Sequence, residues 1–290
     1  MSKGVAFVTG ASRGVGKGAA IELAKAGFDV AIAARTVHEG EGGDEIEPDR
    51  VLPGSLDSTA EAIRAIGRKV LPVRLDLLDR STWKPAIDNA LSEWGRIDVL
   101  VNNARHQRYD HKARFADVSI DTLESEIDAN LFAPVYLAKL VLPGMIERGS
   151  GVIMSLTTGA GYRDPEAVAE KGGWSTSYAL AKGGLHRLVP MIAMELGEKG
   201  ILAFNVNPGF VVTEKNEARI AALGMGIHVG ARPSVPGSVI AWLAHSPEAA
   251  ALNGRTIISQ AFALERGIHK EWRSPEAVAA APAGSVTCII

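Results

Sequence analysis

Short apolar runs alternate with longer stretches of helical periodicity along the chain. The apolar runs are rich in Val, Ile, Leu and Ala and predict strands at residues 4–9, 29–34, 69–75, 97–101, 151–156, 201–206 and 255–259. The patterns between them predict helices at 15–26, 55–67, 82–94, 123–148 (one long helix or two), 175–199 and 234–245. Strands that are apolar on both faces are typical of a parallel sheet between two helical layers. The sequence therefore predicts an α/β protein.

This alternation runs through residues 1–273 without a linker, which predicts a single domain. Residues 36–54 interrupt it with a polar, acidic stretch that we expect to be a surface excursion. Residues 209–233 follow the sixth strand, and we expect them to cover the substrate at the carboxyl edge of the sheet. The Ala- and Pro-rich residues 274–290 form either a tail or a packed extension.

Composition narrows the class of protein. Hydrophobic residues make up 47% and charged residues 22% of the chain, which excludes a mainly disordered protein. The net charge of −2 offers no attraction for nucleic acid or an anionic membrane surface. No uninterrupted apolar stretch approaches the ~18 residues of a membrane span. The single cysteine, Cys288, excludes an intrachain disulfide framework and fits a cytoplasmic protein. His106 and His111 have no histidine partner at metal-ligand spacing, so we expect no metal.

A glycine-rich turn joins the first predicted strand to the first predicted helix. It runs from Thr9 to Gly16 and has glycines at positions 10, 14 and 16. Glycine allows positive φ and a close approach of the backbone to a ligand, and the N-terminus of the following helix attracts anions. The turn therefore predicts a phosphate-binding site. An ordinary glycine-rich turn is the alternative.

A tyrosine and a lysine lie four residues apart in the helix predicted at 175–199. Tyr178 and Lys182 therefore share one face of that helix. A phenol has a pKa of about 10, and a nearby ammonium lowers that pKa because it stabilises the phenolate. A tyrosine tuned in this way is able to exchange a proton with a substrate oxygen.

With these features the chain resembles the short-chain dehydrogenase/reductase family. Three further matches support the resemblance: Asn102-Asn103-Ala104, Asn130 within Asp-Ala-Asn-Leu, and Asn207-Pro208-Gly209 with Thr213. Five motifs thus occur in family order over about residues 4–260. The resemblance implies a Rossmann-type doubly wound parallel sheet of about seven strands, with helices on both faces and a bound nicotinamide dinucleotide.

The resemblance also implies catalytic roles. Tyr178 is implied to be the acid/base, and Lys182 is implied to hold the nicotinamide ribose as well as to tune the tyrosine. Asn130 is implied to hold a water that links Lys182 to solvent.

The family's substrate-binding serine aligns with Thr158, whose hydroxyl donates and accepts as serine does. Thr157 and Ser155 are the alternatives if the register differs. Residues 159–173 make the interval between Thr158 and Tyr178 longer than usual in the family, and we expect them to form a loop beside the substrate.

The end of the second strand bears on the choice of cofactor. Ala34 stands where NAD-dependent enzymes usually carry an acidic residue for the ribose 2′-hydroxyl, and Arg35 with Arg13 offers donors for a 2′-phosphate. We therefore favour NADP(H), whereas NAD(H) fits equally if Arg35 is only a solvated loop cation. The expected cofactor site comprises Gly10, Ser12, Arg13, Gly14, Val15, Gly16, Arg35, Thr36, Asp76, Leu77, Asn103, Ala104, Tyr178, Lys182, Pro208, Gly209, Val211 and Thr213.

Two features bear on the substrate. Arg105 stands where the family usually has glycine, and it aids the phosphates, faces the substrate or turns outward. Residues 220–229 are markedly apolar, which favours an apolar alcohol or carbonyl compound unless these residues simply pack against the body.

The sequence is compatible with two functions, which belong to different classes of protein. The first is an oxidoreductase that transfers a hydride between NADP(H) and a small, apolar secondary alcohol or ketone. The second is a non-catalytic dinucleotide-binding regulatory or scaffold protein on the same fold, because fold alone does not fix function. The resemblance also implies that the helices near 123–148 and 175–199 pair between subunits in a homodimer or homotetramer.

Overall fold

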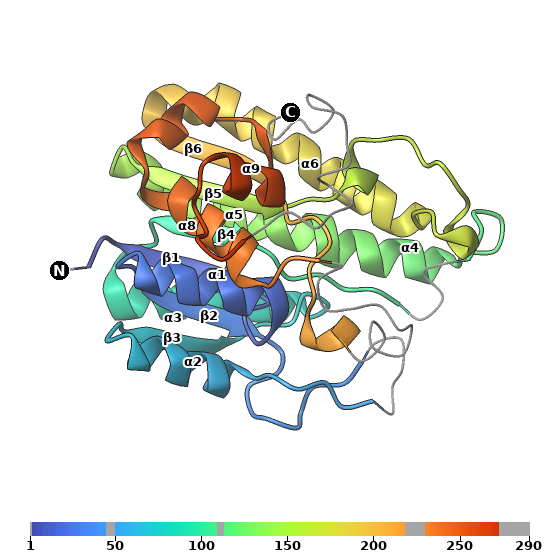
Figure 1. The fold of residues 1–290 in the computed structure, drawn as a ribbon, viewed down its shortest axis with the longest axis horizontal. Helices are drawn as coiled ribbons and strands as arrows, with labels where there is room; N and C mark the ends of the chain where they lie inside the picture. Colours follow the sequence, from blue (N-terminus) through green and yellow to red (C-terminus); the bar gives the residue numbers. More distant parts are fainter. Residues whose placement is uncertain (1, 45–49, 109–112, 218–229, 273–290) are drawn as a thin grey trace.

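A seven-stranded parallel sheet forms the centre of the protein in the computed structural model, which describes residues 2–44, 50–108, 113–217 and 230–272 (Figure 1). The strands are β1 Val5–Thr9, β2 Asp29–Ala34, β3 Val70–Arg74, β4 Val99–Asn102, β5 Gly151–Leu156, β6 Ile201–Asn207 and β7 Thr256–Ile258. Their order in the sheet is β3-β2-β1-β4-β5-β6-β7. The order reverses between β1 and β4, and ligands of such sheets bind outside the carboxyl ends of the strands at that point.

Helices cover both faces of the sheet (Figure 1). One face carries α1 Gly14–Lys25, α2 Leu56–Ala65, α8 Ser234–His245 and α9 Ser259–Glu265. The other carries α3 Trp83–Trp94, α5 Ala133–Glu147 and α6 Thr176–Leu196, and α4 Ile120–Ile127 packs against α6. Short 3₁₀ helices lie at Arg80–Thr82, Gly159–Gly161, Ala169–Lys171, Gly197–Lys199 and Pro247–Leu252. The predicted sheet with helices on both faces is confirmed.

Successive strand residues alternate between two hydrophobic cores. Val8 and Ile32 pack under α1 and α8, whereas Phe7 and Leu100 pack under α3 and α5. All four side chains are fully buried. This two-sided burial explains why the central strands are continuous apolar runs in the sequence.

The stretch predicted at 123–148 as one long helix or two consists of two helices, α4 and α5, joined by a π-helical turn at Asp128–Phe132. The C-terminal end of the sheet differs from the prediction. The last strand, expected at 255–259, ends at Ile258, and the chain turns directly into the unpredicted helix α9. That helix forms because Phe262 and Ala263 are buried against the core under α8, a tertiary contact that local periodicity does not reveal.

The α4–α5 stretch is also apolar enough to be compared with a membrane span. By length and composition alone, Ile120–Glu147 qualifies, with a mean hydropathy of 1.4 in its most apolar window. The sequence analysis expected no span because Pro134 and Lys139 interrupt the apolar run. In the structure Leu137 and Val141 of this stretch are buried in the sheet core. Core helices have the same composition as spans, so the match is weak evidence for a membrane segment.

Helices α1 and α8 pack backbone to backbone at two glycines. A methyl group on Gly18 would lie 2.4 Å from the Pro233 carbonyl oxygen, and one on Gly237 would lie 2.7 Å from the carbonyl carbon of Gly18. Neither neighbour is a flexible side chain that could move aside.

We expect Gly18→Ala to lower the free energy of unfolding by about 2 kcal/mol, because the added methyl overpacks this contact. Urea denaturation checks the value. Gly183→Ala is the matched control, since its methyl would meet only the Gly161 carbonyl at 3.8 Å. The control variant should gain about 0.5–1 kcal/mol from the higher helix propensity of alanine. Equal effects of the two substitutions would contradict the proposed backbone contact.

Candidate active site

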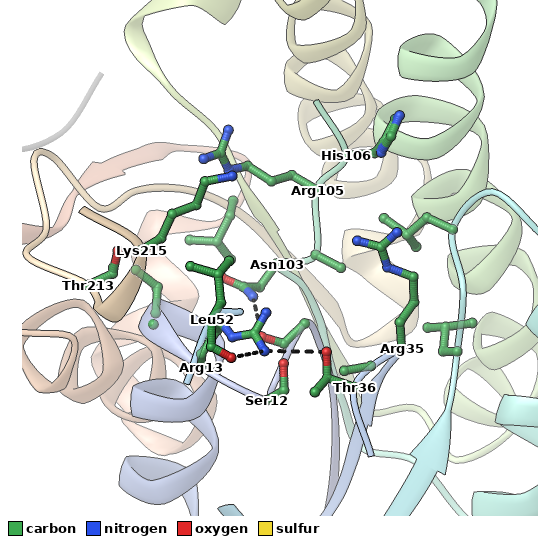
Figure 2. Close-up of a pocket in the computed structure, with 18 of the residues that line it drawn as sticks. Ser12, Arg13, Arg35, Thr36, Leu52, Asn103, Arg105, His106, Thr213 and Lys215 are labelled. Atoms are coloured by element: carbon green, nitrogen blue, oxygen red, sulfur yellow. Dashed lines mark hydrogen bonds between the residues drawn. The ribbon is translucent and has the colours of Figure 1, made fainter. Parts of the chain in front are cut away.

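The carboxyl ends of the central strands open into one pocket (Figure 2). Of the residues predicted for the cofactor or for catalysis, the pocket is lined by Gly10, Ser12, Arg13, Gly14, Val15, Arg35, Thr36, Asp76, Leu77, Asn103, Ala104, Tyr178, Lys182, Pro208 and Thr213. Five of the predicted residues do not line it, namely Gly16, Asn130, Thr158, Gly209 and Val211. Lining residues that the sequence analysis did not assign include Gly43, Leu52, Leu156, Thr157, His106 and Lys215.

The glycine turn between β1 and α1 forms an anion cradle. Gly10 and Gly14 adopt φ of +67° and +55°, which side-chain-bearing residues rarely adopt. The N–H of Gly14, the first residue of α1, donates to Glu214 Oε2 at 2.9 Å. An anionic oxygen therefore already lies where a phosphate oxygen is expected, and the cradle fits a phosphate group.

Gly16 does not line the pocket, but the shape of the turn requires a glycine at this position. A methyl group on Gly16 would lie 2.2 Å from the carbonyl oxygen of Gly10. Asn103, at the end of β4, donates from Nδ2 to the Thr9 carbonyl at 2.8 Å and to the Gly10 carbonyl at 3.3 Å. The predicted motif after β4 thus fixes the cradle from the neighbouring strand.

The side chain of Arg13 is held by the segment that the sequence analysis took for a surface excursion. Its guanidinium donates to the carbonyls of Pro53 (3.0 Å), Leu52 (3.4 Å) and Gly54 (2.8 Å), and to Thr36 Oγ1 (3.3 Å). Much of its donor capacity is therefore used within the protein. The segment wraps this arginine and contributes Leu52 to the pocket, so the surface description was incomplete.

Arg35 lies on the other side of Thr36 from Arg13. In Figure 2 the guanidinium groups of Arg35 and Arg13 lie apart, on opposite sides of Thr36. Arg35 also lines a second, polar cavity with Glu41, Asp44 and Arg74. The two arginines expected to share a 2′-phosphate therefore do not converge in this structure.

Tyr178, Lys182 and Thr158 meet beyond the cradle. The ammonium of Lys182 donates to the Leu156 carbonyl at 2.8 Å and lies 6.0 Å from the centre of the Tyr178 ring. The Thr158 hydroxyl forms a side-chain hydrogen bond with Tyr178.

The other two hydroxyls considered for the substrate face different partners. Thr157 Oγ1 lies 3.3 Å from Nδ1 of His186, and Ser155 is fully buried within β5. Thr158 is thus the hydroxyl that accompanies the tyrosine.

The expected lowering of the Tyr178 pKa is wrong for this structure. Burial raises the pKa of Tyr178, the positive charge of Arg105 opposes this, and the Glu126 carboxylate raises it further. Burial also lowers the pKa of Lys182 to about 7, and the charge of Arg105 adds to that shift. A lysine that is partly neutral does little to stabilise a phenolate, so desolvation dominates.

Arg105 acts on the site electrostatically, since its charge affects both Tyr178 and Lys182. It lines the pocket and bonds to Oε1 of Gln107. Of the three orientations considered, an arginine turned away from the site does not fit these contacts.

Asn130 lies in the π-helical turn and holds the loop after β4. Its Oδ1 accepts from the His106 N–H at 2.8 Å, and its Nδ2 donates to the His106 carbonyl at 2.8 Å. Both ends of the side-chain amide are therefore engaged.

Two positioning residues were not predicted from the sequence. Glu126 is fully buried and accepts from Ser177 Oγ at 2.9 Å and from the Arg108 N–H at 3.0 Å. Gln260 of α9 donates to the carbonyls of Pro208 and Phe210 at 2.9 and 2.7 Å, so it braces the turn after β6. Glu126 lies four residues before Asn130, and this spacing of about one helical turn could have indicated that Glu126 lies near the site. Gln260 contacts a segment about 50 residues before it in the sequence, and no local pattern indicates such a contact.

Comparison with known proteins places this site in a family. The family model described as short chain dehydrogenase matches residues 4–223. A cyclohexanol dehydrogenase of Rhodococcus sp. (strain TK6) is 30% identical over 223 residues, which cover 76% of this chain and 78% of the relative. The chain belongs to the short-chain dehydrogenase family.

Two further relatives agree with this assignment. The 3-oxoacyl-[acyl-carrier-protein] reductase FabG of Staphylococcus aureus (strain Mu50 / ATCC 700699) is 30% identical over 213 residues, 73% of this chain and 76% of the relative. The crystal structure of acetoin dehydrogenase YohF from Salmonella typhimurium superposes with a TM-score of 0.70 at 26% identity, covering 89% of this chain and 94% of that one.

Membership makes the chain an oxidoreductase that acts on alcohol or carbonyl groups and binds a nicotinamide dinucleotide. The geometry fits that cofactor, because the cradle at Gly14 already binds a carboxylate and lies in the same pocket as Tyr178 and Lys182. In this short-chain dehydrogenase the cradle would hold phosphate and Lys182 would hold a ribose hydroxyl.

The lowered pKa of Lys182 makes stability depend on pH. Its pKa is about 7 in the folded protein and near 10.5 in the unfolded chain, so the unfolded chain binds more protons between these values. Stability contributed by this group rises with pH across that window and is lost as pH falls toward 7. Between pH 7 and pH 9 the wild type should gain about 2 kcal/mol relative to Lys182→Met.

Urea denaturation at the two pH values measures this difference. Lys139→Met, which removes an exposed lysine of α5, is the control and should follow the wild type. A wild type and a Lys182→Met variant that keep a constant difference at both pH values would contradict the burial of a titrating ammonium.

Proposed function

We propose that the protein is an NADP(H)-dependent carbonyl reductase or alcohol dehydrogenase for small, apolar substrates, with Tyr178 as the proton donor and acceptor. The observation that carries the proposal is that Tyr178 and Lys182 line the pocket that also contains the anion cradle, with Thr158 beside the tyrosine. When bound, the dinucleotide supplies or accepts the hydride.

The tyrosine is set up as an acid. Because burial raises the pKa of Tyr178, its phenol is protonated at neutral pH and can donate to a carbonyl oxygen. The Thr158 hydroxyl beside it is able to donate a second hydrogen bond to the same oxygen, which orients the carbonyl. The arrangement favours reduction of a carbonyl compound at neutral pH.

Lys182 supports the proton transfer. With a pKa of about 7 it exists in both protonation states near neutrality, so it can return a proton toward the tyrosine without a large energetic cost. Asn130 holds the loop after β4 through the main chain of His106.

Tyr178→Phe removes the proton donor and keeps the ring. We expect kcat to fall by about 10³, because general acid–base catalysis contributes 10²–10⁴, while the dissociation constant for NADPH changes less than about twofold. Steady-state kinetics with a panel of cyclic and aliphatic ketones, with fluorescence titration of NADPH, measures both. The control is Tyr136→Phe on the exposed side of α5, which should retain activity. A Tyr178→Phe enzyme that keeps its turnover would overturn the acid/base assignment.

The preference for NADP(H) is supported by the chemistry at the end of β2. The strand ends in Ala34, so no carboxylate at that position repels a 2′-phosphate, and Arg35 follows in the pocket lining. Arg13 is bound to the 52–54 carbonyls, so we assign the 2′-phosphate to Arg35.

Arg35→Ala should therefore weaken NADPH about tenfold and leave NADH nearly unchanged, as a lost charge-assisted contact predicts. Isothermal titration with each dinucleotide measures the two constants. Arg35→Lys should lie between the wild type and the alanine variant. Arg64→Ala, at an exposed position of α2, controls for loss of one positive charge. Equal weakening of both dinucleotides would argue against a 2′-phosphate contact.

The apolar character of the substrate rests on the sequence of residues 220–229, which lie outside the described residues. The name of the Rhodococcus relative, a dehydrogenase of an apolar cyclic alcohol, agrees with it. Leu156 and Pro208 supply apolar surface to the described part of the pocket.

Assembly through the long helices is part of the proposal. Large apolar side chains are exposed on α6 and at the start of α5, namely Phe132, Tyr136, Leu180, Met191 and Met194. Exposed apolar surface of this kind favours helix pairing between subunits, in a homodimer or homotetramer.

A further inference from the structure

One carboxylate from a distant part of the chain occupies the anion cradle. Glu214 lies 200 residues after Gly14 and follows Thr213 of the motif after β6. Its Oε2 accepts the Gly14 N–H at 2.9 Å, and its charge also acts on the guanidinium of Arg13. The bond joins the start of α1 to the stretch at 213–217.

Helix α1 has no anion of its own at this end. Its first turn contains no acidic residue, and the N-cap residue Arg13 makes no side-chain cap. Glu214 therefore supplies the negative charge that the N-terminal N–H groups and the helix dipole favour. This carboxylate stabilises the helix in the way that a bound phosphate would.

Residues 213–217 are also held by contacts other than the Glu214 hydrogen bond. Lys215, which lines the pocket, pairs with the buried Asp44 at 3.0 Å between Nζ and Oδ1. Asn216 holds the stretch in shape, since its Oδ1 accepts the Thr213 N–H at 2.7 Å and its Nδ2 donates to the Val211 carbonyl at 2.9 Å. Glu214 is therefore held in place rather than extended into solvent.

We propose that Glu214 competes with the pyrophosphate of the dinucleotide for the Gly14 N–H and so sets the affinity for the cofactor. One N–H cannot donate a strong bond to two anions, and two negative oxygens at one donor repel each other. Binding of pyrophosphate at the cradle must displace the carboxylate. The inference rests on the dinucleotide binding of the proposed function, but not on the choice between NADPH and NADH.

Glu214→Gln tests the competition, because it removes the charge and keeps the size of the side chain. We expect both NADPH and NADH to bind about fivefold to tenfold more tightly, since the pyrophosphate is common to both. The midpoint of thermal unfolding without dinucleotide should fall by about 1–3 °C, because α1 loses its anion. A purely structural role for Glu214 would lower stability without improving affinity.

Titration calorimetry with NADPH and with NADH, and thermal unfolding without dinucleotide, measure these effects. Glu217→Gln is the matched control, since it makes the same change of charge three residues away at an exposed position and should alter neither quantity. Glu214→Ala removes the acceptor as well and should tighten binding at least as much as glutamine does.

Unchanged or weaker binding of both dinucleotides by the two Glu214 variants would overturn the inference and leave the proposed function standing. Tighter binding of NADPH alone would also overturn it, because the carboxylate would then act at the 2′-phosphate and not at the pyrophosphate. A wild type that binds neither dinucleotide would instead overturn the proposed function and the inference with it.

Discussion

The close packing of backbone at the turn between β1 and α1 is the constraint on which the site depends. Gly16 leaves no room for a side chain against the Gly10 carbonyl, and Asn103 ties the same carbonyl to the end of β4. These contacts direct the N-terminus of α1 toward the carboxyl ends of β1 and β4, where the strand order reverses. The glycine turn and the end of β4 are thereby fixed relative to each other at the edge of the pocket.

Desolvation governs the acid–base pair at the other end of the pocket. Burial moves the pKa of Tyr178 up and that of Lys182 down to about 7, so both groups favour their neutral forms. Burial is the larger cause of the Lys182 shift, and the charge of Arg105 adds to it, whereas the same charge opposes the rise in the Tyr178 pKa. The result is a proton donor beside a group that titrates near neutrality, a combination suited to proton transfer at ordinary pH.

The sequence predicts those parts of the fold and site that depend on local pattern. The buried strands follow from continuous apolar runs, and the cradle, Tyr178 and Lys182 follow from spacing within a single turn or helix. Contacts between distant segments could not be predicted in this way. Helix α9 depends on burial of Phe262, the hold on Arg13 depends on three carbonyls about 40 residues away, and the direction of the Tyr178 pKa shift depends on burial.

The acidic segment between β2 and α2 shows why charge counted along a sequence misjudges the potential at a site. Six carboxylates next to a phosphate cradle would repel a phosphate if they were unpaired. The three that the structure describes are each engaged. Glu39 accepts the Gly54 N–H at 2.6 Å, Glu41 accepts the N–H groups of residues 37 and 38, and Asp44 pairs with Lys215. Asp44 is paired with a cation, whereas Glu39 and Glu41 keep their charge and hold the segment through its own backbone N–H groups. The segment in turn holds Arg13 through the backbone carbonyls of residues 52–54.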